Sequence, residues 1–310
     1  MSAIRVDGLR KAFGPLQALD GLTFAVEPGT VFGFLGPNGA GKTTTLRILA
    51  GLARPDAGQA WIAGERVGPE SPARRILGYL PEEPHFFGWM TPTEFLSDYV
   101  GGLFGMPPAT ARTRASELLD LVGLSESRQR RIAGFSRGMR QRLGLAQALI
   151  NRPGVVLLDE PVSALDPSGR REMLLCIERL KSETTVLMST HILDDVERVC
   201  DTVAIIDHGR LVALDARQAL LERYAIPAVE LEFDAAPDPV RIWAETLRGQ
   251  PGVASVSVAG HEVRICLDGG PSAGRALLRL AIDSGLPVQR FAMAKPTLED
   301  VFLRLVGPQG

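Results

Sequence analysis

An eight-residue stretch over positions 36–43 constrains this chain more than any other feature of its sequence. It follows the pattern G-x-x-x-x-G-K-T and lies between the apolar run Val31–Leu35 and a predicted helix over Thr43–Leu52. A short apolar run without alternation is typical of a strand covered on both faces. Glycines let the backbone curl so that several N–H groups face one anion, and the helix start adds free donors and a positive dipole end. The pattern therefore predicts an α/β fold with a phosphate-binding loop.

This loop is expected to bind the phosphates of a nucleotide. Lys42 would place its ammonium on the β- and γ-phosphates, and the Thr43 hydroxyl would bind Mg²⁺. The alternative, an ordinary glycine-rich turn, is disfavoured by the strand–loop–helix context. The predicted nucleotide-binding residues of the loop are Gly36, Pro37, Asn38, Gly39, Ala40, Gly41, Lys42, Thr43 and Thr44.

A second apolar run, Val155–Leu158, ends in the two carboxylates Asp159 and Glu160. In open α/β sheets, ligands bind outside the carboxyl ends of the strands. Asp159 would hold the water shell of the magnesium, and Glu160 would polarise the attacking water. Positioning and charge neutralisation supply most of the rate of phosphoryl transfer, because its transition state is loose. Taken alone, such a pair often caps the next helix instead.

Composition limits the partners of the chain. Its 310 residues favour two domains over one. The formal net charge of −2 has no basic excess that would point to nucleic acid. The three cysteines are widely spaced without a metal-ligand pattern, which suits a reducing compartment. No apolar run approaches the roughly 18 residues of a membrane span, so a membrane role is expected to come through a partner.

The predicted secondary structure changes from mainly strands to mainly helices within the first half of the chain. Residues 1–83 read as strands with one helix, and residues 84–152 are mainly helical. Further strands alternate with helices after that. One of these helices is predicted over Arg170–Leu180, and its inward-facing residues are expected to be Leu174, Leu175, Ile177 and Leu180.

After about Tyr224 the pattern restarts as βαββαβ with a final helix. That order favours a small α+β domain with a ferredoxin-like sandwich. We therefore expect an ATPase domain over 1–223, with its helical insertion at about 84–152, and an accessory domain over 224–310.

The stretch Phe135–Arg142, FSRGMRQR, resembles the signature motif of ATP-binding-cassette ATPases, and it stands shortly before the acidic strand as in that family. Arg137 replaces the usual glycine and Met139 the usual glutamine, whereas Ser136 and Gly138 remain. A hydroxyl and a bare backbone N–H at a helix start can grip a γ-phosphate. Without this context the stretch could also be a serine-capped basic helix.

The resemblance covers about residues 3–218. It implies a P-loop NTPase (RecA-like) core with an antiparallel β subdomain and a helical insertion. It also implies that two subunits, either two copies or two paired cassettes, sandwich two ATP molecules head to tail. Each nucleotide would touch the phosphate loop of one subunit and Ser136 and Gly138 of the other.

Other positions match the family one by one. Phe13 sits where an aromatic ring stacks on adenine, although it could be an ordinary strand-end core residue. Glu82 occupies a loop position where glutamine is usual, and a carboxylate there could contact Mg²⁺. Ser163–Asp166 resembles the loop that crosses to the partner subunit. His191 matches the switch histidine that reaches the γ-phosphate, although a lone histidine at a strand end is more often a cap or surface residue. The resemblance thus makes Lys42, Glu160 and His191 the expected catalytic residues, and Thr43, Glu82 and Asp159 the expected magnesium ligands.

Two stretches indicate a membrane partner. In the family, the helical insertion carries a groove that receives a short helix of the membrane subunit. Here the groove would be edged by His85–Met90, HFFGWM, whose aromatic residues favour an interface over the alternative of core packing. The tail, including Leu298–Leu303, resembles the C-terminal extension of an exporter branch that pumps drugs, antibiotics, lipids or polysaccharides. We therefore expect a cytoplasmic protein, peripheral at the inner face of the cell membrane, that works with an integral-membrane permease.

Three functions compete. A transport ATPase is favoured. A soluble cassette ATPase acting on nucleic acid or ribosomes would usually carry two cassettes, a coiled-coil insertion or zinc cysteines, and none of these is found in the sequence. A generic phosphate-loop kinase or GTPase is disfavoured by the signature motif, by His191 and by the lack of an Asn-Lys-x-Asp motif. The transported molecule is not encoded in this chain, because substrate contacts lie in the membrane partner.

Overall fold

A computed structural model describes residues 2–68, 70–224, 227–268, 272–294 and 297–306. The chain divides into two compact units, Met1–Arg217 and Gln218–Gly310, and the division falls at helix α8 (Arg217–Tyr224). Each unit encloses its own hydrophobic core. Each is described below by itself.

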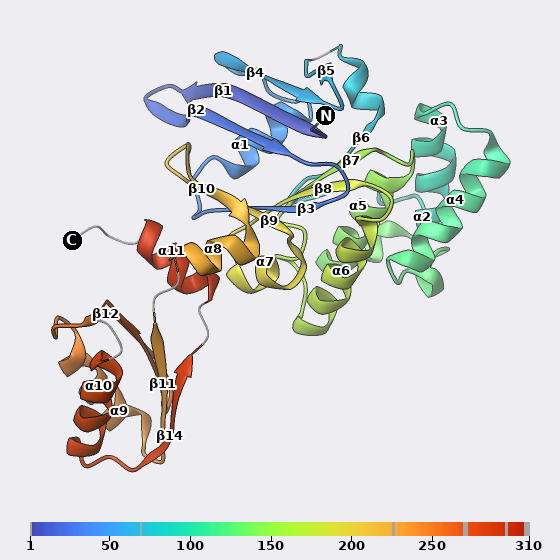
Figure 1. The fold of residues 1–310 in the computed structure, drawn as a ribbon. Helices are drawn as coiled ribbons and strands as arrows, with labels where there is room; N and C mark the ends of the chain where they lie inside the picture. Colours follow the sequence, from blue (N-terminus) through green and yellow to red (C-terminus); the bar gives the residue numbers. More distant parts are fainter. Residues whose placement is uncertain (1, 69, 225–226, 269–271, 295–296, 307–310) are drawn as a thin grey trace. The chain divides into compact units, whose positions relative to one another are not determined.

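The first unit consists mainly of strands up to β6, of helices between β6 and β7, and of alternating strands and helices after β7 (Figure 1). Its elements are β1 (Ile4–Phe13), β2 (Leu16–Val26), β3 (Val31–Leu35), α1 (Lys42–Leu49), β4 (Ala57–Ile62), β5 (Glu65–Arg66), η1 (Pro72–Arg75), β6 (Leu77–Leu80), α2 (Pro92–Glu94), η2 (Phe95–Val100), α3 (Gly101–Leu103), α4 (Pro108–Leu121), η3 (Ser125–Ser127), η4 (Ile132–Gly134), α5 (Arg137–Leu149), β7 (Val155–Asp159), α6 (Pro167–Leu180), β8 (Thr185–Thr190), α7 (Leu193–Val199), β9 (Thr202–Asp207) and β10 (Arg210–Ala216).

A six-stranded sheet in the order β10-β9-β3-β8-β7-β6 forms the centre of this unit. All its neighbouring strands pair in parallel except β10, which pairs antiparallel with β9. The register places Leu35 opposite Thr190 and Asp159 opposite Ser189. Strands β3, β8 and β7 therefore end side by side at one edge, which is where open α/β sheets bind ligands.

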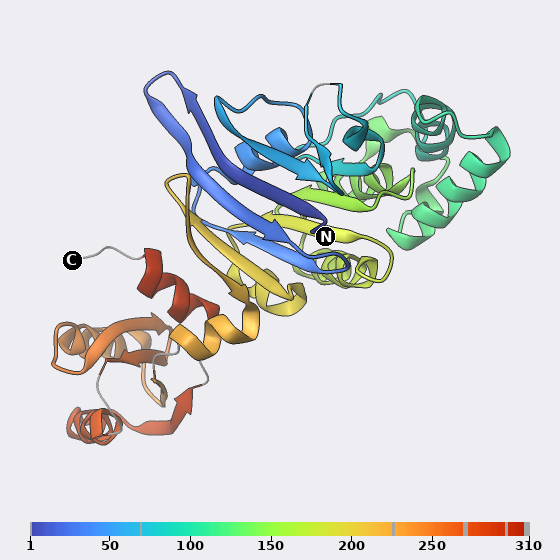
Figure 2. The same cartoon turned by 45° about the horizontal axis from the view of Figure 1, so that its top comes forward.

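A second, antiparallel sheet in the order β2-β1-β4-β5 lies over the first (Figure 2). Its inner face is apolar because alternate residues of β1 and β2 point toward the core. Phe24 of β2 packs on Phe32 and Phe34 of β3, with ring centroids 5.6 and 5.3 Å apart. This packing is the predicted combination of a nucleotide-binding core and an antiparallel β subdomain.

The stretch 84–152, where the sequence indicated a helical insertion, contains the helices α2 to α5 (Figure 1). The chain enters it through a capping box, in which the side chains of Thr91 and Glu94 each accept a hydrogen bond from the other's backbone N–H. Helix α5 then returns toward the sheet and packs on β6 and β7.

Three local predictions are wrong. Helix α6 begins at Pro167 rather than Arg170, because Asp166 caps it and proline suits the first helical position. Helix α1 ends at Leu49 rather than Leu52, because Gly51 takes a left-handed φ of +68° that ends the helix, and Leu52 is exposed. Leu175 was expected to face inward, but it is 46% exposed. It lies on the outer side of α6, whereas Leu174, Ile177 and Leu180 are buried as expected.

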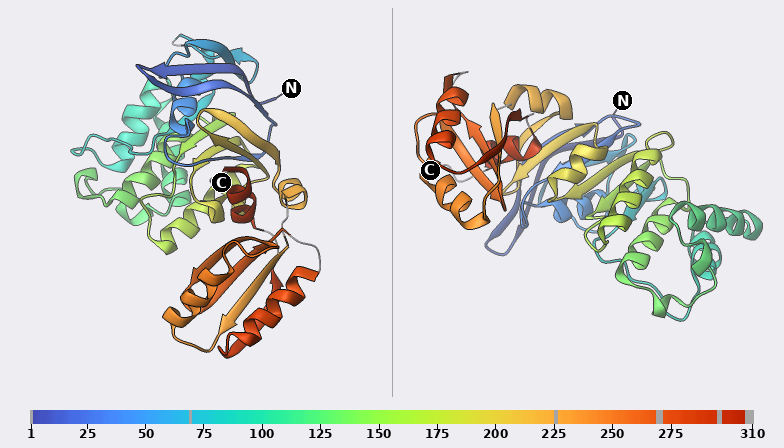
Figure 3. Two further views of the ribbon diagram at one scale, coloured as in Figure 1. Left: turned by 90° about the vertical axis from the view of Figure 1, so that its left-hand side faces the viewer. Right: turned by 90° about the horizontal axis from the view of Figure 1, so that it is seen from below.

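The second unit is a four-stranded antiparallel sheet in the order β12-β13-β11-β14, with α9 and α10 covering one face (Figure 3). This arrangement confirms the predicted ferredoxin-like fold. Its elements are β11 (Ala228–Phe233), α9 (Pro237–Leu247), β12 (Val253–Ala259), β13 (Glu262–Leu267), α10 (Ser272–Asp283), β14 (Val288–Ala294) and α11 (Leu298–Val306).

Candidate active site

The phosphate loop joins β3 to α1 and is tightly curled at its two ends. A Cβ atom added to Gly36 would lie 2.4 Å from the Ile206 carbonyl oxygen. Gly41 has a φ of +104°, and a Cβ there would lie 2.6 Å from the Ala18 carbonyl oxygen. Only glycine satisfies both conditions, left-handed backbone and close approach. The first turn of α1, which begins at Lys42, leaves its N–H groups without intrahelical partners. The loop thus forms a ready anion cradle.

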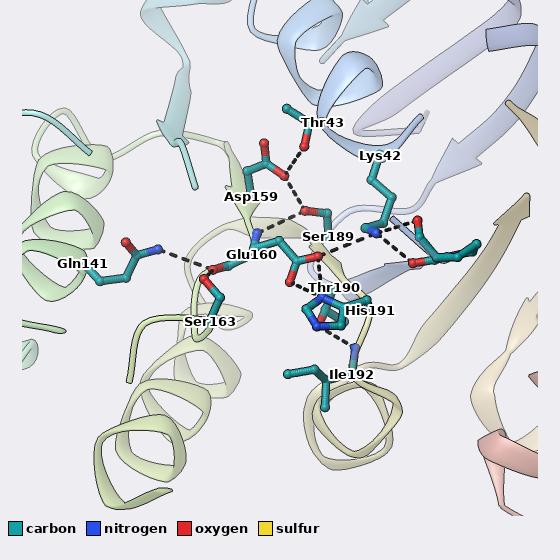
Figure 4. Close-up of polar contacts among 12 residues, drawn as sticks. Lys42, Thr43, Gln141, Asp159, Glu160, Ser163, Ser189, Thr190, His191 and Ile192 are labelled. Carbon is teal, nitrogen blue, oxygen red and sulfur yellow. Dashed lines mark hydrogen bonds and ion pairs between the residues drawn. The ribbon is translucent and has the colours of Figure 1, made fainter. Parts of the chain in front are cut away.

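The side chain of Lys42 turns into this loop (Figure 4). Its ammonium donates hydrogen bonds to the carbonyl oxygens of Gly36 at 2.7 Å and Pro37 at 3.1 Å. It also lies 3.6 Å from Glu160 Oε1. Burial lowers the pKa of Lys42, and the carboxylates of Glu160, Asp159 and Glu82 oppose that shift. The cation is therefore held beside the loop by acceptors that an incoming phosphate can replace.

Asp159 ends β7 beside the start of α1. Its Oδ1 accepts hydrogen bonds from the hydroxyls of Thr43 at 3.1 Å and Ser189 at 2.7 Å. Its Oδ2 is buried and has no hydrogen-bond partner in the part of the chain that the structure describes. A buried carboxylate oxygen without a partner is unfavourable unless another group binds it. Hydroxyl and carboxylate oxygens are the ligands that Mg²⁺ prefers, so the residues present fit this ion.

Glu160 follows Asp159 in a strained conformation. Its φ of +48° is left-handed, which is rare for a residue with a side chain. The strain is held by hydrogen bonds from its N–H to the backbone oxygen of Ser189 at 3.2 Å and to the Ser189 hydroxyl at 3.1 Å. His191 Nδ1 lies 3.0 Å from each carboxylate oxygen of Glu160. Strain that the surroundings maintain in this way clusters at functional sites.

Sequence reasoning missed two residues of this cluster. Ser189 joins the Asp159 carboxylate to the Glu160 N–H, and Gln141 Nε2 donates to the Glu160 carbonyl oxygen at 3.5 Å. Gln141 is 1% exposed. A polar residue on an otherwise apolar strand, and an amide in the apolar stripe of α5, were the signals that could have identified them.

The structure does not bring the remaining predicted residues into this cluster. Phe13 lies 54% exposed at the end of β1, with the Lys11 ammonium 5.4 Å from its ring centroid. Ser136 caps α5 by accepting a hydrogen bond from the Met139 N–H at 3.2 Å, and Gly138 is half-buried. Among the described residues, neither forms a hydrogen bond with Lys42, Asp159, Glu160 or His191. Glu82 is exposed after β6, and it has no hydrogen-bond or salt-bridge partner among them.

Comparisons with known proteins agree with this geometry. A family model described as ABC transporter matches residues 19–163, and one described as ATP-binding protein DrrA1-3-like, C-terminal domain, matches residues 218–306. The chain is 39% identical to an uncharacterized ABC transporter ATP-binding protein, YxlF, of Bacillus subtilis, over 98% of this chain and 99% of that protein. It is 38% identical to the Nod factor export ATP-binding protein I of Ralstonia nicotianae, over 98% of this chain and 94% of that protein.

A solved ATP-binding subunit of an ABC transporter superposes with a TM-score of 0.65 at 30% identity, covering 72% of this chain and 93% of that one. The alternative of an ATPase that acts on nucleic acid or ribosomes finds no support in these similarities. Within the residues that the structure describes, every helix is too short or too polar to cross a bilayer. Proteins of this family bind and hydrolyse ATP, pair with membrane permeases and form dimeric cassettes. The chain belongs to the ATP-binding subunits of ABC transporters.

Proposed function

We propose that this subunit hydrolyses Mg-ATP with Lys42, Thr43, Asp159, Glu160 and His191, and so powers outward transport through a separate permease. One observation carries the proposal. These five side chains lie where three neighbouring parallel strands end, Lys42 and Thr43 at the start of α1 after the loop that follows β3, and the others at the ends of β7 and β8. Thr43 contacts Asp159, and Lys42 and His191 both contact Glu160. The anion cradle, the cation ligands and the pair that orients water thus lie together, which is the set that phosphoryl transfer needs.

The phosphate loop binds the nucleotide in this proposal. The backbone N–H groups of residues 38–44 surround the phosphates, and Lys42 exchanges its bonds with Gly36 and Pro37 for bonds with the β- and γ-phosphates. Phe13 is exposed at a strand end and supplies a ring face for the adenine. The Lys11 ammonium lies 5.4 Å from the centroid of this ring, in the range of a cation–π contact.

Thr43 and Asp159 hold the magnesium, and Glu82, which is exposed after β6, is a further proposed carboxylate ligand. The buried, unpartnered Oδ2 of Asp159 supports this role. The Glu82 carboxylate is also among the charges that oppose the lowering of the Lys42 pKa. The ion supplies neutralisation of the charge that develops on the phosphates.

Glu160 and His191 orient the attacking water. Glu160 accepts a hydrogen bond from the water, whose oxygen attacks the γ-phosphorus while the bond to the oxygen of ADP breaks. The proton of the water passes by way of Glu160 to the released phosphate. His191 fixes the carboxylate at 3.0 Å and reaches toward the γ-phosphate. Positioning of this kind is the main contribution a protein makes to phosphoryl transfer.

The site is completed by a second cassette placed head to tail. Ser136 and Gly138 lie outside the cluster of their own chain, although they form a helix start suited to a γ-phosphate. A partner subunit, either a second copy or a different cassette, brings its own Ser136 and Gly138 positions onto the nucleotide. This two-fold contact explains why two of the predicted nucleotide ligands are remote from the loop.

The permease docks on the helical insertion. Phe87 and Trp89 are 44% and 69% exposed and lie beside a 380 Å³ groove lined by residues of the 82–88 loop and of α5. Exposed aromatic side chains favour protein interfaces. Docking there would hold the subunit at the inner, cytoplasmic face of the membrane. The Nod factor export relative and the DrrA-like C-terminal match support a drug, antibiotic, lipid or similar molecule as the exported substrate.

The test compares Glu160→Gln with Glu65→Gln, which removes an exposed carboxylate of β5. Glu160→Gln should bind Mg-ATP normally, lose at least 100-fold in turnover and form an ATP-dependent dimer on size exclusion. Glu65→Gln should behave as wild type. Asp159→Asn should lose the gain in melting temperature that Mg²⁺ adds to ATP alone. Wild-type turnover by Glu160→Gln would contradict the proposal.

A further inference from the structure

A buried ion pair joins the two helices that follow the candidate active site. Arg170 of α6 donates from Nε to Asp195 Oδ1 of α7 at 2.7 Å. The Asp195 side chain is fully buried, and Arg170 is 30% exposed. The helices pack side by side (Figure 1). The pair is absent from the sequence-based expectations, and it lies outside the cluster of groups that would contact ATP.

A residue shortly before each helix contacts Glu160. Ser163, in the loop before α6, donates from its hydroxyl to the Glu160 carbonyl oxygen at 3.1 Å. Helix α6 then starts with its capping residue Asp166, four residues before Arg170. On the other side, His191 lies 3.0 Å from the Glu160 carboxylate and stands four residues before Asp195. The segments 163–170 and 191–195 are therefore joined at both ends, by their contacts with Glu160 at one end and by the Arg170–Asp195 ion pair at the other.

Joining two helices through this ion pair has a desolvation cost, because the charge of Asp195 is buried. Asp195 Oδ2 has no hydrogen-bond partner among the described residues. Burial raises the pKa of Asp195 despite the hydrogen bond from Arg170, and the Glu160 carboxylate adds to the rise. Apolar residues of similar volume usually join helices as stably as a buried ion pair does. What the pair adds is a defined register between α6 and α7, which is the best-attested use of such pairs.

We propose that Arg170 and Asp195 are positioning residues, whose ion pair sets the register of α7 against α6 and thereby holds His191 on Glu160. The proposal rests on the proposed roles of Glu160 and His191. It assigns the pair no contact with ATP. The pair acts through the short segment 191–195, which leaves little slack between the buried carboxylate of Asp195 and the imidazole.

The first test removes the pair without leaving an unpaired buried charge. The double variant Arg170→Met/Asp195→Leu should lower kcat about 10- to 100-fold, because displacing a catalytic group by an ångström has effects of this size. The affinity for ATP should be unchanged, because the phosphate loop does not contact either side chain. Asp195→Asn keeps the shape and an acceptor for Arg170, and it should recover most of kcat. Lys181→Gln breaks the ion pair with Asp201 at the other end of α6 and serves as the control, with wild-type kcat expected.

The second test separates positioning from general destabilisation. In a His191→Ala background, the same double variant should cause no further loss of kcat, because the two changes remove one function. If the double change lowers kcat by the same factor in the His191→Ala background as in the wild type, the proposal is overturned. If the apolar double variant does not fold, Arg170→Lys takes its place in this cycle, with a smaller loss expected. Wild-type turnover by His191→Ala would refute the proposed role of His191 itself. If His191→Ala lowers kcat but the double variant Arg170→Met/Asp195→Leu keeps the wild-type kcat, only the role of the ion pair is refuted.

Discussion

The Lys42 ammonium lies 3.6 Å from Glu160 Oε1, and both side chains are buried. The proposed phosphate clamp and the proposed orienting carboxylate therefore neutralise each other across the site. A triphosphate bound in the loop would attract the ammonium and leave Glu160 with His191. ATP binding would thus also release the Glu160 carboxylate from its ion pair, because the Lys42 ammonium would leave Glu160 to bind the phosphates.

Replacing the clamp tests this relationship. Lys42→Ala should weaken Mg-ATP binding about 10- to 100-fold, since a hydrogen bond to a charged group contributes about 1.5–3 kcal/mol. Isothermal calorimetry measures this loss, and circular dichroism checks that the variant is folded. Binding at wild-type strength would contradict the assignment of the loop.

The curl of the phosphate loop depends on glycine at position 41. Gly41→Ala should abolish ATP binding and destabilise the chain, because the added Cβ meets the Ala18 carbonyl oxygen at 2.6 Å and φ is +104°. Gly64→Ala is the matched control, since Gly64 has a φ of +84° with nothing within 4 Å of its Cβ position. The control should lose only about 1 kcal/mol from backbone strain and keep its ATP affinity. Urea unfolding and nucleotide titration of both variants measure the difference, and equal behaviour would show that close approach is unimportant at Gly41.

The exposed aromatic surface should matter for docking rather than for chemistry. Trp89→Ser should leave the ATPase activity of the purified subunit unchanged but reduce its co-purification with the permease. The reason is that Trp side chains that become buried on binding contribute much of the binding energy of interfaces. Leu16→Ser, at a comparably exposed position (65% against 69%) in the β1–β2 hairpin, should reduce neither. Undiminished recovery of the complex with Trp89→Ser would remove this surface from the proposed interface.

The second unit contains a buried ion pair whose strength depends on pH. Arg264 donates to both carboxylate oxygens of Asp300, at 3.3 and 2.7 Å, and Asp300 is 3% exposed. Burial would raise the pKa of Asp300, but hydrogen bonds from Arg264, Cys266 and Thr297 outweigh it and hold the pKa below its ordinary value of 3.8. The stabilisation is therefore fully present above pH 3.8, and it is lost as pH falls through the lowered pKa of the folded state.

Asp300→Asn should accordingly destabilise the second unit at pH 7 by about 3–5 kcal/mol, the range for breaking a buried pair. The difference from the parent should shrink below pH 3.8. Trp243, which packs on Phe233 in this unit at 5.0 Å between ring centroids, reports its unfolding by fluorescence. The measurement is made in a parent chain that carries Trp61→Phe and Trp89→Phe. A difference that does not change with pH would contradict the linkage.

Local pattern was sufficient for much of the fold. The unbroken apolar runs Val31–Leu35 and Val155–Leu158 predicted buried strands because a strand covered on both faces needs apolar residues on both. The βαββαβ order after Tyr224 predicted the second fold because short connections restrict the possible topologies. Leu175 was misplaced because the periodicity of α6 defines an apolar stripe but does not define how far a neighbouring helix covers it.

Local sequence patterns predicted that a glycine-rich loop, two carboxylates and a histidine follow buried strands, because these residues stand in recognisable local contexts. The folded structure was needed to establish that β3, β8 and β7 are neighbours, which brings Lys42, Glu160 and His191 into contact. The hydrogen bonds that join Ser189 to Asp159 and Arg170 to Asp195 became visible only there, because the sequence does not show which residues far apart in the chain are partners. Strand order and helix packing are set by burial summed over the whole core, which no short segment encodes.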